Sequence, residues 1–95
     1  MEKNDVIKVL EEAILLRKKD IAERQIDIDN YRLSLSLIDE KYSDNKDVAD
    51  YRRHLEELLR TSILEQTKVK IFLEATERNL KGVLATCGGV NAIQF

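Results

Sequence analysis

A seven-residue repeat of apolar and aromatic side chains runs through the first half of the chain. Its members are Ile7, Ile14, Ile21, Ile28, Leu35 and Tyr42, and Leu10, Tyr31 and Ile38 follow three of them at a spacing of three. Spacings of three and seven place side chains along one side of an α-helix, here called the seam. The pattern predicts one helix over residues 5–42, and Asn4 or Asp5 is expected to cap it.

A polar segment separates this helix from a second one. Residues 43–47 read Ser-Asp-Asn-Lys-Asp, and serine, aspartate and asparagine favour both turns and helix starts. Apolar residues then follow a broad helical face from Val48 to Leu84, until Gly88-Gly89 favours a helix end. We therefore expect a turn at 43–47 and a second helix over about 46–86. A link this short makes the two helices antiparallel neighbours.

The first helix carries another row of apolar residues nearly opposite the later part of the seam. They are Leu15, Ala22, Ile26, Leu33 and Leu37, within about 60° of one another at ~100° per residue, and Leu64 and Ile71 form a shorter counterpart on the second helix. We call these seven residues the outer stripe. A lone hairpin has no way to bury both sides of a helix, so the outer stripe predicts a partner surface, most simply a second copy.

These patterns predict the fold class and domain organisation. We expect an all-α protein, built as a single helical-hairpin domain over residues 1–95. The hairpin is antiparallel, has two helices and is coiled-coil-like. Two copies are expected to pair into a homodimeric four-helix bundle, in which every helix has two neighbours.

Charged residues interrupt the seam of the first helix in its middle third, at Arg17 and Arg24. The length of the turn is compatible with two registers, in which the numbers of facing residues add up to 86 or to 93. Both registers place the two arginines near the level of Ser62 and Glu65, with Gln66 beside them. The sequence therefore predicts a polar layer in the seam and leaves the register open.

Composition narrows the range of partners. The chain has 16 Lys and Arg against 18 Asp and Glu, a formal charge of −2, so it lacks the single-sign field typical of a nucleic-acid-binding protein. The longest aliphatic run, residues 13–16, is far shorter than the roughly 20 residues of a membrane-spanning helix. One cysteine and an N-terminus without signal-peptide features indicate a cytoplasmic protein, in the host cytoplasm if the chain is viral.

Catalytic chemistry is not favoured by the spacing of the reactive residues. His54 and Cys87 are 33 positions apart. If both sit on one helix, they are separated by roughly 50 Å at the helical rise, which is too far for a nucleophile–base pair. We therefore expect no catalytic residue, cofactor or resident metal. Asp50 and Glu57 share a helical face with His54, which leaves a metal-binding helical bundle as one alternative function.

The basic clusters Arg17-Lys18-Lys19 and Arg52-Arg53 leave a nucleic-acid-binding accessory protein as a second alternative. The preferred hypothesis is a non-enzymatic protein–protein interaction module. Adaptors, assembly chaperones and small inhibitors carried by phages or mobile elements are built in this way. The expected partners are a second copy of the chain and another, unidentified protein.

An apolar tail follows the glycine pair. Val90, Ile93 and Phe95 are large and apolar, which is unusual for a chain end left in water. Two interpretations stay open: the tail folds back over the end of the hairpin, or it docks into a pocket of a partner. The tip is similar to the Ile-Pro-Phe end of bacterial single-strand-binding proteins, without their acidic lead-in.

Two families of small helical hairpins resemble the chain in outline. Small secreted hairpins with a Trp-x-Gly turn are similar in size, and secretion-needle subunits resemble it in layout. The turn at 43–47 contains neither the tryptophan and glycine of the first family nor the proline usual in the second. No residue of either family carries over, so neither resemblance assigns a function.

Overall fold

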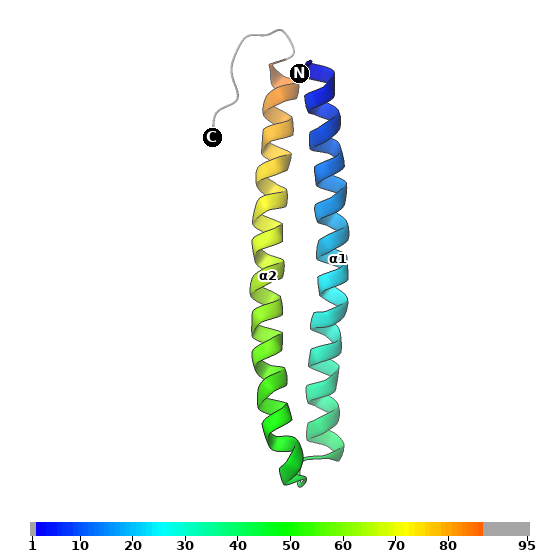
Figure 1. Ribbon diagram of the computed structural model, residues 1–95, viewed down its shortest axis with the longest axis vertical. Helices are drawn as coiled ribbons and strands as arrows, with labels where there is room; N and C mark the ends of the chain where they lie inside the picture. Colours follow the sequence, from blue (N-terminus) through cyan, green and yellow to red (C-terminus); the bar gives the residue numbers. More distant parts are fainter. Residues whose placement is uncertain (1, 87–95) are drawn as a thin grey trace. The chain divides into compact units, whose positions relative to one another are not determined.

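In a computed structural model the chain forms two α-helices, and the structure describes residues 2–86 (Figure 1). Helix α1 spans Lys3–Lys41 and helix α2 spans Lys46–Ala85, with 39 and 40 residues. No strand occurs in this described range. Both predicted helices are therefore present, and the polar segment between them is the turn. Helix α1 begins two residues earlier than expected.

The two helix starts differ in how they are capped. Glu2 O accepts hydrogen bonds from the backbone N–H groups of Asp5 and Val6, both at 3.1 Å, so Glu2 takes the capping position of α1. The predicted caps at Asn4 and Asp5 are wrong, because both residues already lie inside the first turn of the helix. At the start of α2, Asn45 Oδ1 accepts from the Asp47 N–H at 2.9 Å, and this cap is of the predicted type.

Contacts group the chain into two compact units. The first unit combines the part of α1 up to Asp20 with the part of α2 from Val69 onward, and the second unit is Ile21–Lys68 with the turn. Within each unit a segment of α1 contacts a segment of α2, so the helices contact each other as a hairpin. The expected four-helix bundle involves a second copy and stays a prediction. In the described range neither helix has an apolar stretch long enough to cross a membrane.

The buried apolar residues lie along the seam of α1 and on α2. Ile14 and Val83 are buried in the first unit, and Ile28, Ile38 and Leu55 are buried in the second. Three other repeat members, Ile7, Ile21 and Leu35, are half-buried. Tyr42 is exposed, because α1 ends at Lys41 and the side chain no longer follows the helical face.

The buried strip of α2 is narrower than its apolar face. Tyr51, Ile63, Phe72 and Leu84 belong to the predicted face, yet they are exposed. The buried positions of α2 are Leu55, Gln66, Thr76 and Val83, and two of these four are polar. One neighbouring helix covers only the middle of a face that extends over a third to a half of a turn. The broad face therefore does not identify the buried centre.

Direct contacts between the helices define the pairing. In the second unit, Gln66 contacts both Ile21 and Gln25, and Arg52 contacts Asp39. In the first unit, Arg17 contacts Phe72, and Lys3 contacts Thr86. The numbers of these partners add up to between 87 and 91. The side-chain contacts therefore lie between the two registers compatible with the turn, and neither register alone describes them.

Candidate interaction surface

The outer stripe lies on the surface of both units. All seven of its members, Leu15, Ala22, Ile26, Leu33, Leu37, Leu64 and Ile71, are exposed. Leu15 and Ile71 belong to the first unit and the other five belong to the second. Single exposed leucines are common on soluble proteins, but a row of exposed apolar residues along one helix is typical of a surface that binds a partner.

Helix α1 shows the contrast most clearly within the second unit. Ile28 is 1% exposed against α2, whereas Ile26 is 61% exposed and Leu33 is 66% exposed. At ~100° per residue these exposed side chains lie nearly opposite the buried one, so a single neighbour does not cover both sides. We call Ala22, Ile26, Leu33 and Leu37 the outer α1 surface. It is the candidate interaction site of the second unit.

One end of the outer α1 surface continues into a groove beside the turn. The groove holds about 320 Å³ and is lined by Ser34, Leu37, Ile38, Tyr42, Val48 and Tyr51. Leu37 belongs to both features, and both tyrosines are exposed. Tyrosine combines a large apolar ring with a polar hydroxyl and is enriched at the energetic centres of interfaces. The sequence pattern places Tyr42 in the seam and Tyr51 on the broad apolar face of the second helix, and it gave no sign of this groove.

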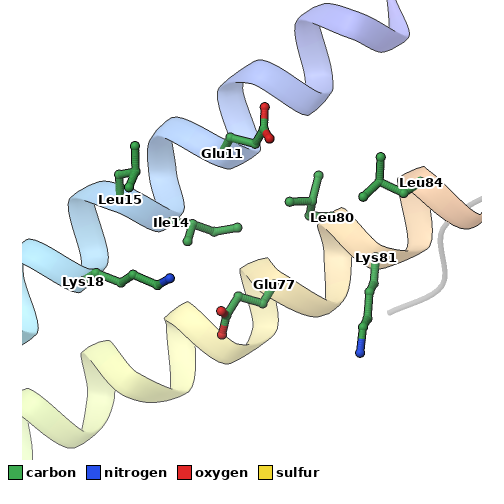
Figure 2. A pocket seen from close by; sticks show the side chains of 8 residues that line it. All are labelled: Glu11, Ile14, Leu15, Lys18, Glu77, Leu80, Lys81 and Leu84. Atoms are coloured by element: carbon green, nitrogen blue, oxygen red, sulfur yellow. The ribbon is translucent and has the colours of Figure 1, made fainter.

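A second groove lies in the first unit between the start of α1 and the end of α2 (Figure 2). It holds about 420 Å³, with an apolar part formed by Ile14, Leu15, Leu80 and Leu84 and charged residues Glu11, Lys18, Glu77 and Lys81 around it. Figure 2 shows Ile14 and Leu80 pointing into the space between the helix segments, while the Lys81 side chain points away. This groove is a further apolar surface of the hairpin.

The four residues of the predicted polar layer are divided between the two units. Arg17 lies in the first unit, with its guanidinium carbon 4.6 Å from the centre of the Phe72 ring. Arg24, Ser62 and Glu65 are half-buried in the second unit. Glu65 pairs with Lys68 at 3.0 Å. The contacts seen for Arg17 and Glu65 are therefore an aromatic ring and a lysine on the next helical turn.

Gln66 is the buried polar residue of the second unit. It is 5% exposed, and its amide donates to Ile21 O at 3.2 Å and to Gln25 Oε1 at 2.9 Å. Gln25 in turn donates to Asp29 at 2.9 Å, so the bonds run from the seam to the surface. The sequence showed Gln66 as a polar interruption of the apolar face of α2. Its central role depends on the register, which the sequence left open.

The residues behind the two alternative functions, nucleic-acid binding and metal binding, include Arg52 and His54 on α2. Arg52 donates to Asp39 at 2.8 and 3.0 Å and to Glu56 at 2.6 Å, so carboxylates already contact one of the basic clusters. The hydrogen bonds from Arg52 lower the pKa of Asp39 from its ordinary value. His54 is exposed, and no group of three potential metal ligands occurs within residues 2–86.

The predicted docking residues of the tail, Val90, Ile93 and Phe95, lie outside the described residues, as does Cys87. No protein-family model, curated protein or solved structure matches the chain.

Proposed function

We propose that this protein is a non-enzymatic interaction module, a helical hairpin that pairs with a second copy and acts by binding another protein. The observation that carries the proposal is the outer α1 surface, a row of exposed apolar side chains on a helix whose opposite side is already covered by α2. Covering one Leu or Ile completely contributes about 1.5–3 kcal/mol. A partner therefore gains stability by covering this row.

The chemistry of the surface indicates the kind of interaction. The outer α1 surface presents aliphatic side chains, and exposed tyrosines lie at one end beside the turn. Aliphatic rows along a helix are the contacts that helices make with other helices, whereas nucleic acids are bound through phosphates by Lys and Arg. We infer that the partner presents an apolar helix or groove. An adaptor, an assembly chaperone and a small inhibitor of a host protein all fit this description.

The experiment compares matched lysine substitutions. Ile26→Lys and Leu33→Lys charge the outer α1 surface, while Leu16→Lys places the same charge at an exposed leucine outside the stripe. Light scattering should give a dimer at micromolar concentration for the wild type and for Leu16→Lys, and a monomer for the two stripe variants. Circular dichroism should show unchanged helix content in all four proteins. A wild-type monomer with intact helices would contradict self-pairing.

A pull-down from the native cytoplasm tests the second half of the proposal. Wild-type bait and the Leu16→Lys control should retain the same partner, and the stripe variants should lose it. A deletion of residues 90–95 is a separate experiment, because we propose that the tail docks into the partner through Val90, Ile93 and Phe95. A chain without residues 90–95 should keep its melting temperature and no longer retain the partner protein. A lower melting temperature with the partner protein still retained would favour the fold-back interpretation.

A further inference from the structure

The outer α1 surface has a spacing that reads the same in both directions. Its four residues, Ala22, Ile26, Leu33 and Leu37, are separated by four, seven and four positions. In a two-fold symmetric contact the same patch meets itself in reverse order. Antiparallel helices bring together residues whose numbers have a constant sum, so a palindromic row can match itself along its whole length.

We propose that two copies of the chain pair through antiparallel α1 helices, with the two-fold axis passing between Asp29 and Asn30. This inference rests on the self-association in the proposed function and adds its geometry. With the axis at this point, Ile26 of one copy faces Leu33 of the other, and Ala22 faces Leu37. Each large side chain meets an apolar one, and the small Ala22 leaves room for a leucine.

The polar residues in the middle of the outer α1 surface would meet the same residues of the second copy. Asp29 and Asn30 occupy the gap between Ile26 and Leu33, one on each edge of the row, and both are exposed. In an antiparallel pair each edge of a helix meets the same edge of its copy. Asn30 therefore meets Asn30 of the second copy. A side-chain amide both donates and accepts, so two identical amides can bond to each other.

The other edge brings together opposite charges. Asp29 accepts a hydrogen bond from Gln25 of its own helix at 2.9 Å, and Arg32 is exposed one turn further along the same edge. Across the two-fold axis, Arg32 lies about two residues from the level of Asp29 in the second copy. This is a distance of roughly 3 Å measured along the helix axis. Two arginines thereby surround the two aspartates near the axis, which offsets the repulsion between the carboxylates.

The position of the surface on α1 sets the arrangement of the assembly. Ile26 and Leu33 lie nearly opposite the buried Ile28 and Ile38, which face α2. In the second unit, α1 would therefore lie between its own α2 and the α1 of the second copy. Within this unit the four helix segments would lie in a row, α2–α1–α1–α2, in place of a closed bundle in which each segment has two neighbours.

Cysteine crosslinking tests the axis in a Cys87→Ser background of the full chain. Asn30→Cys places two thiols at the axis, so a short thiol crosslinker should give a covalent dimer. Ser36→Cys is the control, because it is also exposed but its two copies would be about 20 Å apart along the helix axis. Ala22→Cys and Leu37→Cys should crosslink with each other in a mixture, and neither should crosslink well alone.

The outcomes separate the geometry from the self-association. A several-fold higher yield for Asn30→Cys than for Ser36→Cys, with mixed crosslinking of positions 22 and 37, supports the proposed axis. A dimer by light scattering with equal yields at positions 30 and 36, or without the mixed product, overturns the axis and leaves self-pairing intact. A monomer at every concentration up to that of the crosslinking reaction overturns both.

Discussion

Replacing Gln66 by alanine should lower the stability of the hairpin by an amount that follows from its contacts. The substitution removes two hydrogen bonds, to Ile21 O at 3.2 Å and to Gln25 Oε1 at 2.9 Å. Each bond contributes about 0.5–1.5 kcal/mol, and each buried methylene lost adds about 0.8 kcal/mol. Because Gln66 is 5% exposed, the packing loss is close to complete. We expect Gln66→Ala to cost about 2–4 kcal/mol in the free energy of unfolding.

Gln66→Met separates the two parts of this loss. Methionine keeps most of the side-chain volume but makes neither hydrogen bond, and it gains from apolar burial. We expect Gln66→Met to stay within about 1 kcal/mol of the wild type. A cycle with Gln25→Ala should then give a coupling energy of about 0.5–1.5 kcal/mol, the contribution of the single bond between the two amides.

Urea unfolding followed by far-ultraviolet circular dichroism measures these changes at one protein concentration. The concentration is fixed because pairing with a second copy would itself raise the apparent stability. The slope of the unfolding free energy against urea should be the same for all variants, since each exposes the same surface on unfolding. A Gln66→Ala protein within about 0.5 kcal/mol of the wild type would refute the reasoning, because changes that small are typical of exposed positions.

Three further predictions concern single contacts. The hydrogen bonds from Arg52 lower the pKa of Asp39 in the folded protein below its ordinary value of 3.8. The ion pair therefore stabilises the fold above that pH, and this stabilisation is lost as the pH falls through the lowered pKa of the folded state. Asp39→Asn should remove this pH dependence, so the variant should lose less unfolding free energy than the wild type in titrations below about pH 4. Arg17→Leu should keep or raise the melting temperature, because the ring contact with Phe72 contributes about 0.5–1 kcal/mol and leucine covers the half-buried seam; a lower melting temperature would show that the ring contact dominates. Asn45→Ala should cost about 0.5–2 kcal/mol in thermal unfolding through the lost cap of α2, and an unchanged value would contradict it.

The helices and the turn were predictable because they depend on local chemistry. The seven-residue repeat and the polar residues at 43–47 indicate where helices form and where the chain turns, and the observed helix bounds differ from the expected ones by two residues or fewer. The cap at Asn45 has the same origin, since a short polar side chain satisfies an N–H group two residues later. Glu2 was missed as the first cap because glutamate is not among the preferred capping residues.

The pairing of the helices was not predictable from the sequence in the same way. It depends on which side chains meet over two helices, and the length of the turn is compatible with two registers. Arg17 illustrates the difficulty, because the sequence predicted a polar layer around it, and its observed contact is the ring of Phe72. Gln66 illustrates it too, since a polar residue on an apolar face becomes informative only when the opposing backbone is known.

Helix α1 carries apolar residues on two opposite sides, and this property allows the two roles of the helix to be tested separately. Ile28 is 1% exposed and Ile26 is 61% exposed, although they are the same amino acid two positions apart. Ile28→Ala removes buried methylene groups and should cost about 2–4 kcal/mol in unfolding at any protein concentration. Ile26→Ala should leave the unfolding of the monomer unchanged and shift the dimer midpoint to higher protein concentration. Sedimentation and urea unfolding over a concentration series distinguish the two effects. If both alanine variants destabilise equally at the lowest concentration, the two sides of α1 do not have separate roles, and the proposed interaction surface loses its support.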